Sequence, residues 1–185
     1  MNFKKFFHPL AFVLILLLVY FLLPFLPINR VVFGIIPREP LGLIGIFTSP
    51  LIHANIYHLL SNSVSLLILG GIMFAFYRNS ATYVMIFCYF IPNIIVWFIG
   101  RPAPHVGASG IIYGIAFFLF LIGFLRKDFT STILSVLIII FYGGMFFGLL
   151  PVTEEMSWEG HLGGAVTGIA CAIFFRKPAK RRKLL

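Results

Sequence analysis

The stretch GASGIIYGIAFFLFLIGFL at residues 107–125 decides the fold class of this chain. It opens on the pair Ala108–Ser109, with a glycine on either side, and runs to Leu125 without a charged residue. A helix that crosses the hydrocarbon core of a bilayer needs about 20 predominantly apolar residues. The stretch therefore predicts a membrane-spanning helix with a serine at one end.

The rest of the chain has the same character. Hydrophobic residues make up 61% of the 185 residues and charged residues 10%, whereas soluble domains carry roughly 25% charged residues. A soluble globular protein is therefore excluded. We predict an all-α, polytopic membrane protein, one domain over residues 1–185 folded as a six-transmembrane-helix bundle. The predicted spans are about 9–28, 58–77, 81–99, 109–125, 129–150 and 161–176. Short loops are predicted at 78–80 and 126–128.

The charges predict the orientation of this bundle and its partners. With an even number of spans, 11 of the 14 Lys and Arg residues lie on the side that holds both termini. The positive-inside rule then places the termini, including a basic tail at 177–185, in the cytoplasm. Because the basic residues flank apolar segments, the net charge of +9 indicates a lipid bilayer as partner and excludes nucleic acid.

The uncharged stretch at 40–57 is predicted to be a loop. It contains the helix breakers Pro40, Gly42, Gly45 and Pro50, which punctuate helical patterns. A seventh span would also move one terminus to the wrong side of the membrane. We interpret the stretch as an apolar outer loop that lies in the membrane interface.

Three polar clusters lie at the outer ends of predicted spans, where polar side chains are functional candidates by default. The first contains His58 and Asn62, which share one helical face at i,i+4 spacing. The second is Ser109 with its flanking glycines, and the third surrounds His161. Small residues let two helices approach closely. They recur at Gly110 and Gly114 in one span and at Gly160, Gly164 and Gly168 in another.

If these glycine stripes face each other, Ser109 and His161 meet. A serine beside a histidine is the minimal activated nucleophile. The Ser109 N–H, His58 and Asn62 could then bind a developing oxyanion. Each feature alone favours a packing role, and only the joint pattern favours catalysis. Glu159 stands two residues from His161, a spacing that does not bring helical side chains together, so we predict a Ser–His dyad with no metal or cofactor.

HLLSN at 58–62, GASGIIYG at 107–114 and GHLGGAVTG at 160–168 together resemble the rhomboid intramembrane serine proteases in their bacterial six-span form. The resemblance covers essentially the whole chain. It implies Ser109 as nucleophile and His161 as general base. It also implies His58, Asn62 and the Ser109 N–H as the oxyanion hole, with Tyr113 packed on the imidazole of His161.

The same resemblance implies a setting for the site. The loop at 40–57 would be the family's membrane-embedded first loop, with His53 as a structural histidine. The protein would lie in the bacterial cytoplasmic membrane and cleave single-pass transmembrane substrates near its outer face. The chain departs from the family pattern in two places. Many members carry a Trp-Arg pair in this loop, where this chain has Ile44 and Gly45 near the expected position. Many members also have an acidic residue directly after the glycine pair that ends at Gly71, where this chain has Ile72.

Two alternative functions stay open at this point. A non-proteolytic rhomboid-like protein that binds membrane helices would be expected to lack Ser109 or His161. A small transporter or channel would be expected to show repeats or charges within its spans. Arg101 and His105 carry no assigned role, and we interpret them as interfacial polar residues.

The outer half of the predicted fifth span indicates how substrate could enter. Gly143, Gly144 and Gly148 interrupt its bulky side chains, and glycine destabilises a helix interior by about 0.5–1 kcal/mol relative to alanine. We therefore hypothesise that this half bends away and admits substrate from the lipid.

Overall fold

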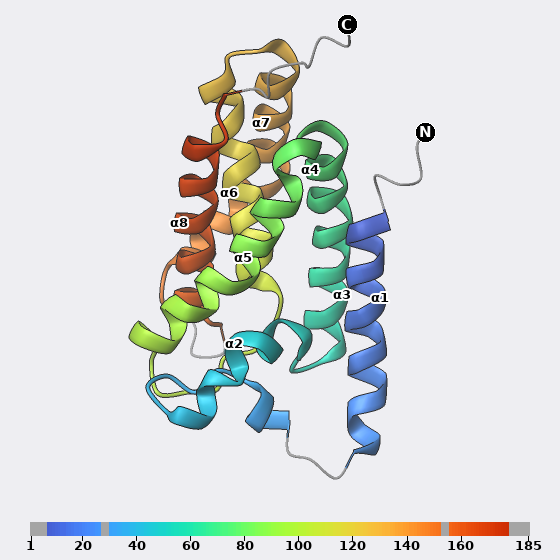
Figure 1. Cartoon of the computed structure of the whole chain (residues 1–185), viewed down its shortest axis with the longest axis vertical. Coiled ribbons are helices and arrows are strands. Elements are labelled where there is room, and N and C mark those ends of the chain that lie inside the picture. Colours follow the sequence, from blue (N-terminus) through green and yellow to red (C-terminus); the bar gives the residue numbers. More distant parts are fainter. Residues whose placement is uncertain (1–6, 27–29, 153–155, 178–185) are drawn as a thin grey trace, which may run out of the picture.

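The computed structural model describes residues 7–26, 30–152 and 156–177, and every regular element in that part of the chain is helical. The α-helices are α1 (Phe7–Leu22), α2 (Gly45–Thr48), α3 (Ile56–Ser65), α4 (Gly71–Phe76), α5 (Arg78–Ile99), α6 (Ser109–Arg126), α7 (Phe129–Tyr142) and α8 (Trp158–Phe174). A π-helical turn, Leu66–Gly70, joins α3 to α4. Figure 1 shows α1 beginning and α8 ending at the same end of the bundle.

Five segments are long and apolar enough to cross a membrane: His8–Phe25, Ile56–Phe76, Arg78–Ile99, Ser109–Arg126 and Phe129–Leu149. The prediction of an all-helical membrane protein is confirmed at this level. The remaining predicted span corresponds to α8, whose 17 residues include four glycines in the sequence GHLGGAVTG. A six-span count stays a prediction. Residues 27–28 of the first predicted span and 178–185 of the predicted tail lie outside the described residues.

Two helices begin three residues earlier than predicted. Arg78 to Ser80 form the first turn of α5, so the predicted loop at 78–80 is wrong. The carbonyl of Tyr77 accepts hydrogen bonds from the N–H groups of Ser80 and Ala81, so a single residue suffices for the turn. Helix α8 begins at Trp158 because the Ser157 side chain accepts a hydrogen bond from the N–H of Gly160, which satisfies one free donor of the first turn.

The predicted span at 129–150 is not one continuous α-helix. Helix α7 ends at Tyr142, and a 3₁₀ helix, Gly143–Leu149, continues the chain. We refer to the whole segment, Phe129–Leu149, as the α7 arm. The predicted loop at 126–128 is shorter in the structure, because Arg126 is the last residue of α6 and only Lys127 and Asp128 separate it from α7. Lys127 has a φ of 56° after the end of α6, and the Asp128 carboxylate caps α7 by accepting from the N–H of Ser131.

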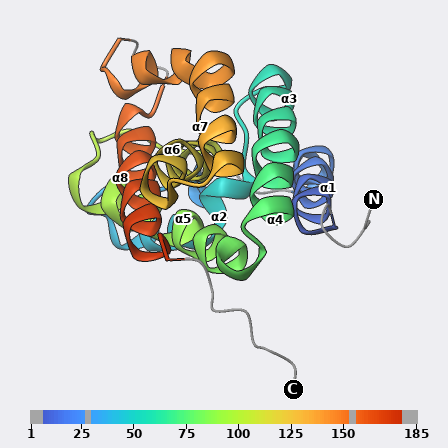
Figure 2. The same ribbon diagram turned by 90° about the horizontal axis from the view of Figure 1, so that it is seen from above.

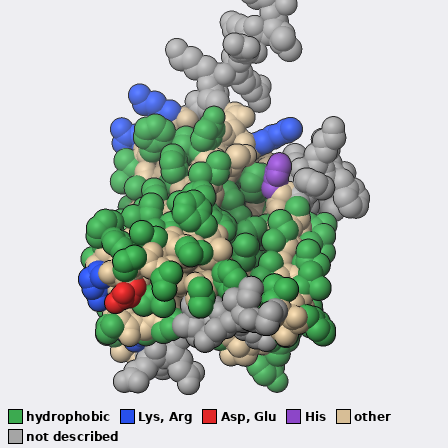
Figure 3. Space-filling model, turned by 60° about the horizontal axis from the view of Figure 1, so that its bottom comes forward, with side chains coloured by type: hydrophobic (Ala, Val, Ile, Leu, Met, Phe, Trp, Pro, Cys, Tyr) green, Lys and Arg blue, Asp and Glu red, His purple; other side chains and the backbone are tan. Residues whose placement is uncertain are grey.

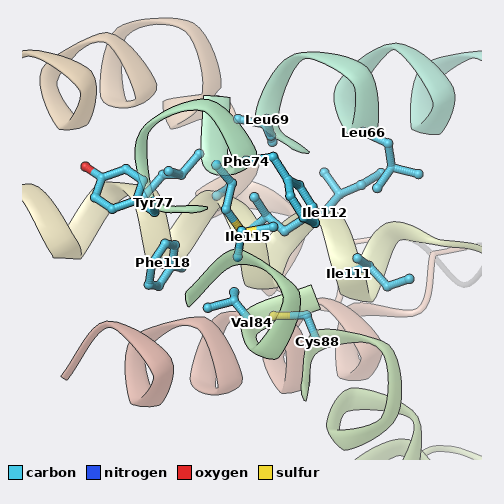
Figure 4. Packing of buried hydrophobic residues seen from close by; sticks show 14 of the residues in the cluster. Leu66, Leu69, Phe74, Tyr77, Val84, Cys88, Ile111, Ile112, Ile115 and Phe118 are labelled. Atoms are coloured by element: carbon cyan, nitrogen blue, oxygen red, sulfur yellow. The ribbon is translucent and has the colours of Figure 1, made fainter. Parts of the chain in front are cut away.

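Helix α6 is the centre of the bundle. Seen from above in Figure 2, it lies among α3, α5, α7 and α8, while α1 packs on the outside. Leu119, Phe118 and Ile115 of α6 are fully buried. Figure 4 shows the cluster that they join, in which Val84 and Cys88 of α5 meet side chains of the α3–α4 segment. Helix α6, which begins at Ser109, is therefore packed against the core on several sides.

The stretch at 40–57 forms short helical turns as far as Leu51, and its last two residues, Ile56 and Tyr57, begin α3. Pro40–Leu43 and Ser49–Leu51 are 3₁₀ helices on either side of α2. Large apolar side chains, including Leu41 and Phe47, are exposed. In Figure 3, hydrophobic side chains cover most of the visible face and charged side chains stand at its margins. Embedding of this loop in the membrane stays a prediction.

Candidate active site

Ser109 is the first residue of α6, and the backbone before it is sharply turned. Gly107 has a φ of 113°, a conformation that favours glycine. A Cβ at Gly107 would come within 2.5 Å of the His58 ring, so the absence of a side chain also lets the loop approach α3. Because Ser109 opens the helix, its N–H is one of the donors that no helix carbonyl accepts. Its side chain is half-buried.

His161 lies in the first turn of α8, and the structure brings it to Ser109. Its Nε2 lies 3.0 Å from the Ser109 Oγ, across 52 residues of sequence. The imidazole is 7% exposed. A buried imidazole within hydrogen-bond distance of a serine hydroxyl is the arrangement that general-base activation requires.

The other imidazole nitrogen determines which tautomer is present. Nδ1 of His161 lies 2.8 Å from the carbonyl oxygen of Gly148, which can only accept a hydrogen bond. Nδ1 therefore carries the proton and donates it to Gly148, and the lone pair of Nε2 faces the Ser109 hydroxyl. Gly148 belongs to the α7 arm, so a backbone carbonyl occupies the place that a carboxylate takes in a catalytic triad.

Tyr113 fixes the plane of the same ring. Its side chain stacks on the imidazole of His161 with ring centroids 4.1 Å apart and an interplanar angle of 5°. Its hydroxyl donates to the carbonyl of Met145 at 3.0 Å. A side chain at Gly148 would collide with this hydroxyl and come within 3.3 Å of the His161 Nδ1. Tyr113 thus touches both the base and the segment that orients it.

Helices α6 and α8 lie side by side (Figure 1), and the glycine contacts show that their glycine stripes face each other. A Cβ at Gly164 would collide with the carbonyl of Gly110, and one at Gly168 would collide with the carbonyl of Gly114. A Cβ at Gly110 would also lie 3.3 Å from the carbonyl oxygen of Gly160. Backbone therefore packs on backbone along this contact, which brings the starts of the two helices together.

The two candidate oxyanion donors lie on α3, beside the loop that carries Ser109. Asn62 is buried, and its Nδ2 lies 3.0 Å from Nε2 of His53. An amide nitrogen has two hydrogens, so one can donate to His53 while the other is free for a ligand. The rings of His53 and His58 are in edge contact, with centroids 5.0 Å apart. Burial, followed by the neighbouring His58, lowers the pKa of His53 to about 4.

These groups share one cavity of about 730 Å³. Its wall includes the side chains His58, Ser61, Asn62, Ser109, Tyr113 and His161. A polar wall of this kind can hold water beside the serine. The cavity thus combines a candidate nucleophile, a candidate base, hydrogen-bond donors and room for a second reactant.

Sequence reasoning missed several residues around this cavity. His105 is 5% exposed and hydrogen-bonds to Ser157, a contact that its interpretation as an interfacial polar residue did not include. Glu159 does not reach His161 but accepts from the N–H of Arg101 at 3.1 Å. Gly148 acts through its carbonyl, which leaves no side-chain signal in a sequence. Ser157 could have been recognised as a helix cap from its position three residues before Gly160.

A family model described as the rhomboid domain matches residues 40–178. Uncharacterized proteins of Mycobacterium tuberculosis and Mycobacterium bovis are each 33% identical to this chain over 161 residues, which cover 82% of this chain and 67% of each relative. An uncharacterized protein of Mycobacterium leprae is 31% identical over 151 residues, covering 76% of this chain and 59% of that protein. On this match and the geometry above, the chain belongs to the rhomboid family.

Proposed function

We propose that the protein is an intramembrane serine endopeptidase that cleaves transmembrane proteins near the outer face of the membrane. The single observation that carries this proposal is the 3.0 Å contact between the Ser109 Oγ and the His161 Nε2, with the proton of the imidazole held on Nδ1 by Gly148. The presence of both groups disfavours the non-proteolytic alternative, which would be expected to lack one of them.

In the acylation step, the Ser109 Oγ attacks the scissile carbonyl carbon while Nε2 of His161 takes the hydroxyl proton. The negative charge moves to the carbonyl oxygen. We assign its stabilisation to the N–H of Ser109 and the free N–H of Asn62, because both residues line the same cavity as His58. The imidazolium then gives its proton to the leaving amine nitrogen. The C–N bond breaks, and an ester to Ser109 remains.

In the deacylation step, a water molecule attacks the ester carbonyl and His161 again takes the proton. The bond between the ester carbon and the Ser109 oxygen then breaks, the serine oxygen recovers the proton from Nε2, and the carboxylic acid product leaves. The polar cavity supplies a place for this water in a setting that is otherwise apolar. The stacked Tyr113 and the Gly148 carbonyl favour one imidazole orientation through both steps, so the mechanism needs no carboxylate.

The proposed setting follows from the charge distribution and from family membership. We infer a bacterial cytoplasmic membrane with both termini in the cytoplasm, because that orientation satisfies the positive-inside rule for 11 of 14 basic residues. The site then lies at the outer end of α6. Single-pass proteins whose helices unwind near that surface are the proposed substrates, because a helical backbone has its carbonyls hydrogen-bonded and shielded.

Labelling with a fluorophosphonate tests the proposal directly. The purified protein in detergent should form a covalent adduct at Ser109, located by peptide mass spectrometry, and Ser109→Ala should form none. Ser61→Ala is the matched control, because Ser61 lines the same cavity but donates to the carbonyl of His58. This variant should still be labelled. Equal labelling of wild type and Ser109→Ala would contradict the proposal.

A further inference from the structure

The α5–α6 loop and the start of α8 are joined near the cavity by two sets of polar contacts. One joins His105 to Ser157, with Nδ1 of His105 2.6 Å from the serine Oγ. The other joins Arg101 to Glu159, through the N–H of Arg101 at 3.1 Å and an ion pair with Nε 3.6 Å from Oε1. We call Arg101, His105, Ser157 and Glu159 the outer latch.

The hydrogen atoms of this latch can be assigned from its acceptors. Nε2 of His105 lies 3.1 Å from the carbonyl oxygen of Arg101, so this nitrogen donates. Burial lowers the pKa of His105, which favours the neutral ring and leaves Nδ1 as an acceptor. The Ser157 hydroxyl therefore donates to Nδ1 while its oxygen accepts from the N–H of Gly160. One hydroxyl thus serves both as the cap of α8 and as the link to His105.

The backbone of His105 is held by a distant segment of the chain. It exchanges two hydrogen bonds of 2.9 Å with Ile35, which lies between α1 and α2. Arg38 extends this support, because its Nη1 donates to the carbonyl of Gly100 at 2.8 Å. The ring of His105 is therefore attached to a platform made by two outer loops and not only to its own chain.

The latch lies close in sequence to both reacting groups. His105 precedes Ser109 by four residues, and Ser157 precedes His161 by four residues. The glycine contacts set how closely α6 and α8 approach, whereas a capping residue sets how the first turn of α8 is presented. His161 lies in that first turn, so its ring direction depends on Ser157.

We propose that His105 and Ser157 are positioning residues that aim the imidazole of His161 at Ser109 through the outer latch. The proposal rests on the proposed function. It adds the pair of side chains that holds His161 and Ser109 in the relative position that proton transfer needs. A displacement of about 1 Å between reacting groups can lower a rate by about 100-fold. Neither residue touches the reacting atoms.

The test measures the rate constant of fluorophosphonate labelling at Ser109 separately from its final amplitude. A residue needed only for stability lowers the amplitude, because fewer molecules are folded, but leaves the rate constant of the folded molecules unchanged. Ser157→Ala and His105→Leu should each lower the rate constant by about 10-fold to 100-fold. The double variant should be no slower than the slower single variant, since both remove one hydrogen bond.

Two further variants serve as controls, one that keeps the Ser157 hydroxyl and one that removes a helix cap elsewhere. Ser157→Thr keeps the hydroxyl and should restore the rate constant. Asp128→Ala removes the cap of α7 at the opposite end of α6, and it should change only the amplitude. Unchanged rate constants in Ser157→Ala and His105→Leu, or losses that multiply in the double variant, would overturn the proposal.

A spectroscopic measurement tests the positioning role of the outer latch without relying on enzyme activity. In protein carrying ¹⁵N-labelled histidine, the His161 signals are identified by their loss in His161→Asn. Wild type should show a protonated Nδ1 and a bare Nε2, and Ser157→Ala should shift toward mixed tautomers. An unchanged spectrum would overturn the latch even in an active enzyme. Failure of the wild type to label would overturn the proposed function. The spectrum would still test whether Ser157 orients the imidazole of His161.

Discussion

Helix α6 and the α7 arm are neighbours in sequence and in space, yet they are packed very differently. In the apolar stretch of α6, 67% of the residues are buried, against 17% in that of the α7 arm. A Cβ at Gly164 would collide with the α6 backbone, whereas one at Gly143 or Gly144 would meet nothing within 4 Å. The same residue type therefore marks a close contact in one region and open space in the other.

The candidate site is divided between these two regions. Ser109 and His161, the candidate nucleophile and base, lie on either side of the tightly packed α6–α8 contact. The Gly148 carbonyl, which accepts from His161 Nδ1, comes from the loosely packed α7 arm. If the α7 arm bends to admit substrate, as we hypothesise, the hydrogen bond of His161 Nδ1 should change as well.

The largest expected effect comes from removing the reactive side chains at the tightly packed α6–α8 contact. Ser109→Ala and His161→Ala should each abolish cleavage of a model single-pass substrate, because each removes one member of the dyad. The double variant should be no worse than either single one, since residues that act as a unit are not additive. Product is measured by gel and mass spectrometry after reconstitution in liposomes, with Ser61→Ala as the control variant, because it keeps both members of the dyad and the outer latch. Appreciable cleavage by purified Ser109→Ala would contradict the assignment.

The next effect concerns the wall of α3 opposite the dyad. Asn62→Ala should lower kcat by about 10²–10³, the usual loss for one oxyanion donor, with a smaller effect on KM. Asn62→Asp should fail as well, because a carboxylate repels the developing charge. Steady-state kinetics with a fluorescent substrate separates the two parameters. Full activity of Asn62→Ala would restrict the oxyanion hole to His58 and the Ser109 N–H.

Acid should destabilise the fold through His53, which contacts Asn62 and His58 of this wall. Its pKa is lowered from 6.5 to about 4 in the fold, so only the unfolded chain takes up a proton between those values. Stability is therefore fully present above pH 6.5 and declines as the pH falls toward 4, by about 3 kcal/mol at most. Thermal unfolding in detergent across this range measures the decline. His53→Leu should flatten it, and an equally steep decline in that variant would assign the effect to other groups.

A matched pair of glycine substitutions tests the packing difference itself. Gly164→Ala should destabilise the protein by about 1–3 kcal/mol, the usual range for overpacking, because α6 and α8 must separate. Gly143→Ala should be neutral or stabilising by about 0.5–1 kcal/mol, because its Cβ meets open space. Thermal unfolding of both variants provides the comparison. Equal shifts in Tm would mean that the two regions do not differ in packing.

The smallest effect is expected from stiffening the α7 arm. Gly143→Ala combined with Gly144→Ala should reduce cleavage of membrane-embedded substrates a few-fold, on the loss of glycine's conformational freedom. A fluorophosphonate that reaches Ser109 from water should react at a near wild-type rate. If both rates fall together, the glycines support the site and not an entry path. If neither falls, substrate enters elsewhere.

Hydrophobic pattern predicted most of the architecture, and its failures have physical causes. The span at 109–125 matches α6 to within one residue because an uncharged run between a serine and Arg126 has clear ends. The loop predicted at 78–80 failed because Arg, Asn and Ser are typical of loops, yet the Tyr77 carbonyl starts α5 without one. The span at 129–150 is apolar throughout, so hydropathy could not indicate the change from α-helix to 3₁₀ helix at Gly143.

The sequence by itself determined the helical membrane class, the facing glycine stripes as a hypothesis, and the residue types of the dyad. These follow from local composition and from spacing along single helices. Only the tertiary structure decided that Ser109 and His161 lie 3.0 Å apart, that Gly148 holds the proton on Nδ1, and that His105 meets Ser157. Those contacts join residues 13 or 52 positions apart. They depend on how closely helices pack and where a backbone carbonyl points, and neither property is written in the periodicity of a sequence.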